Sequence, residues 1–130
     1  MKKKSANLDR GIDGGGPRAR RRIEVEALLQ ASAAFMAREF RRKPPLAEIA
    51  RVAHISEYHF HRLFLKQFGR TPKQMLDDLQ IEEVKRLMLW GFRAYDAARL
   101  AGFSHQSHMN ARFRKAMGMT PVQWLEARRH

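Results

Sequence analysis

Apolar residues recur at helical spacing along most of this chain, and short turn signals interrupt that spacing. Over about 23–42 the pattern predicts one long helix, which ends before Pro44-Pro45 because proline lacks the backbone donor that a helix needs. The residues expected on its buried face are Leu28, Ala31, Phe35 and Phe40. No segment shows the alternation of a strand, so the chain is predicted to be all-α with about seven helices.

Two pairs of helices follow, and each pair consists of a short helix, a tight turn and a longer helix. The first pair covers about 46–69 and the second about 94–118. A linker helix over about 72–89 lies between them, and a last helix covers about 121–129. Ser56 and Ser104 are expected to cap the two longer helices, since a serine hydroxyl accepts a hydrogen bond from a free backbone N–H.

The two pairs are copies of one unit. Phe68-Gly69-Arg70-Thr71-Pro72 and Met117-Gly118-Met119-Thr120-Pro121 lie 49 positions apart, whereas the similar segments 49–53 and 97–101 lie 48 apart. In both copies glycine is expected to end the longer helix and Thr-Pro to begin the next one. A unit of about 27 residues is therefore used twice, and the second copy has one extra residue between Ala101 and Met109.

Each longer helix separates into an apolar face and a polar face. The apolar residues, expected in the core, are Phe60, Leu63, Phe64 and Phe68 in the first copy and Met109, Phe113, Ala116 and Met117 in the second. The polar faces carry little of the Glu-Lys alternation of a solvated helix, and their side chains can hydrogen-bond to base edges. A plain polar surface is the alternative for one such face, but two matched faces favour recognition of a DNA groove.

Charge narrows the choice of partner. A formal net charge of +13 on 130 residues, the size of one domain, indicates a polyanion, most often nucleic acid. Residues 1–18 are rich in glycine and polar residues and predict a disordered basic leader, which leaves 19–130 as the folded domain. Two interpretations stay open for Arg18, Arg20, Arg21 and Arg22: a basic arm along phosphates, or a solvated leader.

The sequence does not favour a secreted protein, a membrane protein, an enzyme or a metal-binding protein. The chain has no cysteine, no signal peptide and no stretch near the ~20 apolar residues of a membrane helix, so a cytoplasmic protein without membrane contact is expected. No catalytic constellation stands out, so it is not expected to be an enzyme. His105 and His108 lack a third ligand, and neither a metal nor another cofactor is predicted.

The linker helix is expected to have a solvated acidic face, formed by Asp77, Asp78, Glu82 and Glu83.

The motifs together resemble the DNA-binding domain of the AraC/XylS family of bacterial transcription regulators over roughly 28–128. Those that carry the resemblance are Leu46-Ala47-Glu48-Ile49-Ala50, Ser56-Glu57-Tyr58-His59-Phe60-His61-Arg62-Leu63-Phe64, Ala98-Arg99-Leu100-Ala101-Gly102-Phe103-Ser104-His105-Gln106-Ser107-His108-Met109, Phe113-Arg114-Lys115 and the two Gly-x-Thr-Pro segments. The resemblance implies two helix-turn-helix units, each with a recognition helix in the major groove, roughly one turn (about 34 Å) apart.

The resemblance also implies partners and contacts. One protomer would read an asymmetric site on double-stranded DNA, and activation would run through RNA polymerase on the bacterial nucleoid. Base-contacting residues would be Tyr58, His61, Arg62, Gln106, Ser107, His108 and Asn110. Backbone contacts are expected from Ser56, Lys66, Ser104, Arg112, Arg114 and Lys115.

The chain departs from the family pattern in places. Position 111, where the family commonly has arginine, is Ala111 in this chain, and arginine follows it as Arg112. Gln80 stands at a position of the linker helix where the family often has arginine. Most members carry a separate effector or dimerisation domain, for which this sequence leaves only the leader. Nonspecific or architectural DNA binding through charge alone is the alternative function.

Overall fold

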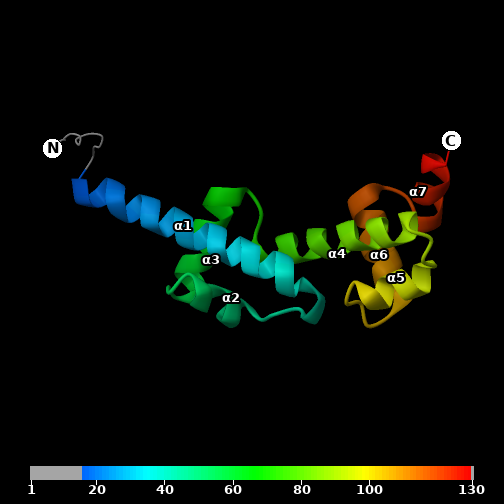
Figure 1. Cartoon of the computed structure of the whole chain (residues 1–130), viewed down its shortest axis with the longest axis horizontal. Helices are drawn as coiled ribbons and strands as arrows, with labels where there is room; N and C mark the ends of the chain where they lie inside the picture. Colours follow the sequence, from blue (N-terminus) through cyan, green and yellow to red (C-terminus); the bar gives the residue numbers. More distant parts are fainter. Residues whose placement is uncertain (1–15, 130) are drawn as a thin grey trace.

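The computed structural model describes residues 16–129, which form seven α-helices and one short 3-10 helix without any strand. The all-α prediction is confirmed. In chain order the elements are α1 (Gly16–Glu39), η1 (Phe40–Arg42), α2 (Leu46–Val52), α3 (Glu57–Phe68), α4 (Pro72–Leu89), α5 (Ala94–Leu100), α6 (Gln106–Met117) and α7 (Pro121–Arg128). Two lobes lie at opposite ends of an elongated molecule, and α4 runs between them (Figure 1).

Each lobe has its own apolar core. The first core is formed by Leu29, Met36, Ile49, Ala50, Ala53, Phe60 and Phe64. The second is formed by Ile81, Val84, Leu87, Met88, Ala97, Ala98, Ala101, Phe103, Met109, Phe113 and Trp124. Helix α4 serves both, because Met75, Leu76 and Leu79 from its first half pack on the first core and its second half is part of the other.

Helix α1 differs from its prediction at both its start and its buried face. It begins at Gly16 instead of about 23, so residues 16–18, which were assigned to the leader, are helical; residues 1–15 lie outside the described residues. Its buried residues are Leu29, Ser32 and Met36, one position on from the predicted Leu28, Ala31 and Phe35. Leu28 and Phe35 are half-buried against the first core, Ala31 is exposed, and Phe40 is buried as predicted, in η1. A polar residue can face inward here because the Ser32 hydroxyl donates to the Ile49 carbonyl at 3.3 Å.

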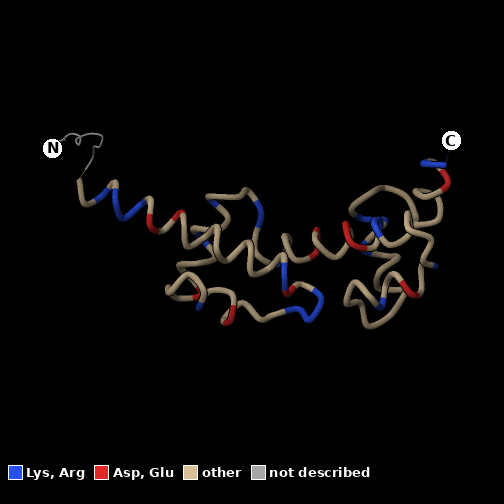
Figure 2. Tube along the Cα trace, viewed as in Figure 1, with Lys and Arg blue, Asp and Glu red and all other residues tan. Residues whose placement is uncertain are grey.

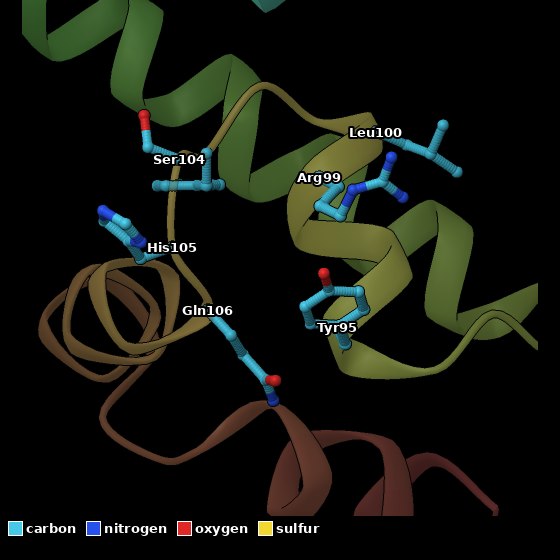
Figure 3. A pocket seen from close by; sticks show the side chains of 7 residues that line it. Tyr95, Arg99, Leu100, Ser104, His105 and Gln106 are labelled. Carbon is cyan, nitrogen blue, oxygen red and sulfur yellow. The ribbon is translucent and has the colours of Figure 1, made fainter.

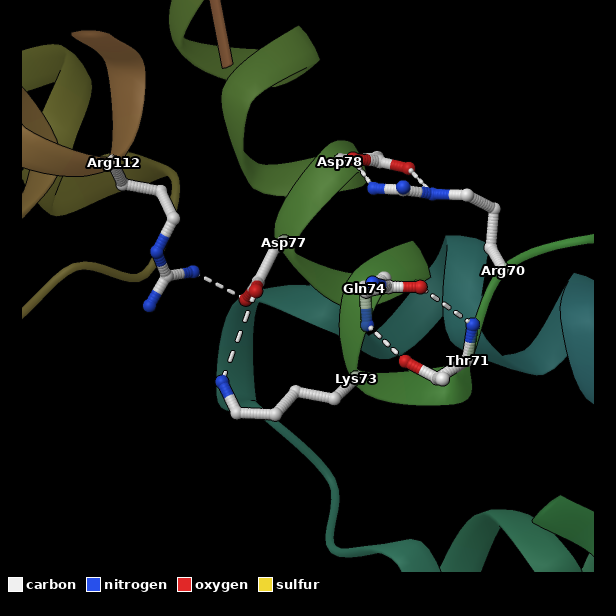
Figure 4. A network of polar contacts seen from close by, with 7 residues as sticks. All are labelled: Arg70, Thr71, Lys73, Gln74, Asp77, Asp78 and Arg112. Atoms are coloured by element: carbon white, nitrogen blue, oxygen red, sulfur yellow. Dashed lines mark hydrogen bonds and ion pairs between the residues drawn. The ribbon is translucent and has the colours of Figure 1, made fainter. Parts of the chain in front are cut away.

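The repeated Gly-x-Thr-Pro segment ends one helix and begins the next in both copies, as predicted. Gly69 and Gly118 end α3 and α6 in the left-handed conformation, with φ of 71° and 76°. Thr71 then forms a capping box with Gln74, in which side chain and backbone bond reciprocally (Figure 4), and Thr120 does the same downstream. The junction between α3 and α4 and the junction between α6 and α7 are therefore built in the same way.

The extra residue of the second copy lies in its turn, as predicted, but it changes the cap. Four residues separate α2 from α3, and five separate α5 from α6. Ser56 caps α3 by accepting from the His59 backbone N–H at 3.2 Å. In the second unit the capping position is His105, which makes no side-chain cap. The predicted cap at Ser104 is thus wrong, because the longer turn places it one residue too early. Ala116, expected in the core, is exposed.

The short element η1, which follows α1 in the first unit, packs against the turn of the second unit. Gly102, with φ of 98°, lies so close to the Arg41 carbonyl that a Cβ at this position would collide with it. The Lys43 ammonium lies 5.8 Å from the centre of the Phe103 ring, in the same turn. The two units are therefore held together by η1 as well as by α4.

Candidate nucleic-acid interface

Helix α3 presents its polar face to solvent because its other face is anchored in the first core. Phe60 and Phe64 are fully buried, with ring centroids 5.3 Å apart. Tyr58 is 75% exposed, and His61 and Arg62 are exposed as well. All three base-contacting residues predicted for this unit thus lie on the surface. The Arg62 guanidinium lies 5.8 Å from the Tyr58 ring centre, a cation–π contact that orders both side chains.

Helix α6 is anchored in the same way, by buried Met109 and Phe113, but its outer face is chemically poorer. Ser107 and Ala111 stand 49 positions after Tyr58 and Arg62, so a short hydroxyl and a methyl group replace an aromatic ring and a guanidinium. Among the other predicted residues, His108, Arg114 and Lys115 are exposed, while Gln106 and Asn110 are half-buried.

Gln106 lies in a surface hollow at the start of α6. Tyr95 and Arg99 of α5 line the same hollow, together with Ser104 and His105 of the turn (Figure 3). The Arg99 guanidinium lies 5.9 Å from the Tyr95 ring centre. Sequence reasoning did not select Tyr95 or Arg99, although Arg99 belongs to a motif that carries the family resemblance. Arg99 is exposed at the end of α5, next to the turn that leads into α6.

Arg112 has an intramolecular partner. Its guanidinium donates to the Asp77 carboxylate on α4, so the side chain that was expected at a phosphate is engaged within the protein (Figure 4). Asp77 also forms an ion pair with Lys73, with 3.7 Å between Nζ and Oδ2. A second nitrogen of Arg112 lies 3.1 Å from Nε2 of His108.

The predicted solvated acidic face of α4 is right for Asp78 and Glu82, which are exposed, and wrong for Asp77 and Glu83, which are half-buried and buried. Each of these carboxylates has a basic partner. Asp77 bonds to Arg112, and Asp78 accepts two hydrogen bonds from Arg70, at 2.8 and 2.9 Å. Glu82 pairs with Lys85 at 2.8 Å. Partners up to 35 positions away cannot be recognised from the helix alone.

Glu83 is the most buried of these carboxylates and joins α4 to η1. It accepts from Arg86 of α4 at 2.8 and 2.9 Å, and from Arg41 of η1. The hydrogen bonds from Arg86 and Arg41 outweigh the effect of burial and lower the pKa of Glu83 from 4.5 to about 2. Glu83 is therefore charged at neutral pH and holds η1 against the linker helix.

Comparison with known proteins decides the family. Residues 49–127, more than half of the chain, match a helix-turn-helix domain family of the AraC type. The chain belongs to the AraC/XylS family. Members of this family are DNA-binding helix-turn-helix transcriptional regulators.

Two regulators are similar to this AraC/XylS-family chain in sequence. An uncharacterised helix-turn-helix regulator of Bacillus subtilis, YbfI, is 36% identical over 75 residues, which are 58% of this chain and 27% of that protein. The probable transcriptional regulator LumQ of Photobacterium leiognathi is 30% identical over 91 residues, 69% of this chain and 37% of LumQ. The chain thus matches well under half of the length of either relative.

The fold is that of solved AraC-type domains. The DNA-binding domain of the global transcriptional factor AdpA, determined in complex with a target DNA, superposes with a TM-score of 0.72 at 22% identity. The match covers 78% of this chain and 93% of the AdpA domain. The predicted arrangement of two helix-turn-helix units joined by a linker helix is therefore confirmed.

Between residues 16 and 129, no cluster of three or more histidine, aspartate or glutamate side chains could hold a metal ion. Within the same range, no helix has both the length and the apolar character that crossing a bilayer requires.

Proposed function

We propose that this domain binds double-stranded DNA sequence-specifically and regulates transcription at bacterial promoters, by inserting α3 and α6 into successive segments of the major groove. The observation that supports the proposal is the pair of exposed polar helix faces on two units of like construction, joined by one continuous helix. One protomer would cover an asymmetric site, since the two reading surfaces differ in chemistry.

Base contacts fall to side chains with donors and acceptors on the outer faces. Arg62 suits guanine, and Gln106 and Asn110 suit adenine. The remaining proposed base contacts are Tyr58, His61, Ser107 and His108. Phosphate contacts are proposed for Ser56, Lys66, Ser104, Arg114 and Lys115, which are exposed. Arg112 would join them only by leaving Asp77.

The regulatory step is proposed to be a contact with RNA polymerase, made in the cytoplasm on the bacterial nucleoid. No cofactor is invoked, because the base and phosphate contacts use only protein side chains and helix N-termini. Binding would stabilise or block the polymerase at a promoter according to where the site lies.

Selection of bound sequences from random duplex DNA tests the proposal. Two conserved blocks about one helical turn apart are expected, with the block read by α3 better defined than the block read by α6. Nonspecific or architectural binding predicts no conserved block, and equal affinity for a selected site and for random DNA at physiological salt. That result would favour nonspecific, charge-driven DNA binding over sequence-specific regulation.

A further inference from the structure

The contact between Arg112 and Asp77 joins the two helix-turn-helix units. Arg112 lies on α6, the recognition helix of the second unit. Asp77 lies in the first half of α4, next to Leu76 and two residues after Met75, which both pack on the core of the first unit. The ion pair therefore ties the second recognition helix to the part of the linker that belongs to the first unit (Figure 4).

The environment of the pair favours a fixed geometry. The side chains of Arg112 and Asp77 are only 21% and 27% exposed, so water screens their attraction less than that of a surface pair. Arg112 also lies 5.9 Å from the ring centre of Phe103, which is buried in the second core. The guanidinium is thus held by α4 on one side and by its own unit on the other.

His108, a proposed base reader, is oriented by the same guanidinium. Arginine can only donate, so the neutral His108 ring must accept at Nε2 across the 3.1 Å contact and carry its proton on Nδ1. The His108 ring also meets the Phe103 ring edge to face, with centroids 5.8 Å apart. Movement of Arg112 would therefore release a neighbouring side chain on the reading surface as well as the helix.

We propose that Asp77 and Arg112 are positioning residues, which set the orientation of α6 relative to the first unit and thereby the spacing between the two halves of the DNA site. The proposal rests on the proposed two-part reading of DNA. In this role Arg112 acts through Asp77 and need not contact DNA, although it lies on a recognition helix.

The neighbouring pair Arg70–Asp78 supplies a matched control. It combines the same two residue types on the next position of α4, with nitrogen–oxygen distances of 2.8 and 2.9 Å. Arg70 follows the end of α3, however, so the hydrogen bonds of this pair lie within the first unit and its linker, although both residues line the same hollow as Arg112 and Lys115 of α6. Its loss should leave the placement of α6 unchanged.

The test measures binding to duplexes in which the two selected blocks are moved apart or together by one or two base pairs. Asp77→Asn and Arg112→Gln are each expected to lower the preference for the best spacing about 3- to 10-fold, the size of a typical contact coupling. Asp78→Asn should keep the wild-type preference. The double variant Asp77→Arg/Arg112→Asp should restore much of the preference for the best spacing. The readout is the ratio of the binding constants at two spacings, so a charge change that affects binding at every spacing alike cancels.

Two outcomes overturn the positioning role. If Arg112 instead holds a phosphate, Arg112→Gln weakens binding at every spacing and reduces the salt dependence, while Asp77→Asn strengthens binding because it frees the arginine. If both single variants keep the wild-type spacing preference, the pair sets no spacing. Failure of the proposed function appears differently, since the wild-type protein itself would then select one block or none.

Discussion

At the scale of single residues, the partner of a charged side chain decides what that side chain can do. Arg62 and Arg112 both lie on recognition helices, yet Arg62 is exposed beside Tyr58 and Arg112 is bonded to Asp77. The difference follows from their place around the helix axis: Arg62 lies opposite the buried stripe, and Arg112 lies on its flank, facing α4. An arginine is thus available for a base only where no carboxylate of the protein reaches it.

Replacing Arg62 should relax sequence specificity. Arg62→Ala removes a proposed two-pronged contact with a guanine, and we expect it to cost about 1–3 kcal/mol at the best site and to flatten the preference at one base position. Lys66→Ala is the control, because a phosphate contact should weaken binding to all sequences alike and lower the salt slope. An unchanged preference among single-base variants of the site would exclude Arg62 as a base reader.

Replacing Glu83 should change how stability depends on pH. Its folded pKa of about 2 is below the ordinary 4.5, so the charged carboxylate stabilises the fold above about pH 4.5, and that stabilisation is lost as the pH falls towards 2. Glu83→Gln should therefore lower the free energy of unfolding by roughly 3 kcal/mol at neutral pH, with a smaller difference in acid.

Urea unfolding of both proteins between neutral pH and about pH 2 measures that difference. Glu57→Gln, at an exposed position at the start of α3, serves as the control and should change stability little at any pH. A loss that is equally large at all pH values would show that shape rather than charge makes Glu83 important.

At the scale of elements, α1 extends beyond the unit that it helps to build. Its first buried residue is Leu29, thirteen positions after the helix begins, and Ile23 is 63% exposed. Basic residues occupy the first turns of this free end (Figure 2). Because this helix end packs on little of the protein, it should contribute little to the stability of the fold. Its arginines are available to a polyanion.

Removing residues 1–22 should affect charge more than structure. The segment carries eight basic and two acidic residues, a net +6, and it ends before the first buried residue of α1. If it lies along phosphates, its deletion should flatten the dependence of the binding constant on salt and keep the selected sequence. An unchanged salt slope would identify a solvated leader, and an altered consensus would show that the segment reads bases.

At the scale of the whole molecule, a small number of contacts join the two lobes, each of which has its own core. Helix α4 enters both cores, Gln80 donates to the Ala101 carbonyl at 3.2 Å, and η1 packs on the turn at Gly102. These contacts and the ion pair Asp77–Arg112 link the two units, and the proposed reading of DNA as two linked halves would depend on them.

Gly102 should be the glycine most sensitive to substitution. Gly102→Ala adds a Cβ against the Arg41 carbonyl at a φ of 98°, and we expect a loss of about 2–4 kcal/mol in the free energy of unfolding. Gly118→Ala is the matched control, since its φ of 76° is also positive but its surroundings are open, and about 1 kcal/mol is expected. Equal losses in the two variants, measured by urea unfolding, would show that the contact with η1 contributes nothing.

The sequence by itself determined the features that depend on near neighbours. The helix ends at Gly69 and Gly118, the caps at Thr71 and Thr120, and the extra residue in the second turn were predictable because each involves groups within a few positions along the chain. The repeated motifs and the apolar stripes of α3 and α6 also identified the family and the two exposed polar faces proposed to read DNA.

Only the tertiary structure decided which polar groups are used inside the protein. Ser32, Gln80, Arg112 and Arg41 bond to groups that lie 17, 21, 35 and 42 positions away. A polar side chain looks solvated from its own helix, and its burial or pairing becomes visible only when a distant element supplies the partner. For the same reason the sequence predicted the two helix-turn-helix units, whereas the contacts that orient one unit relative to the other appeared only in the folded chain.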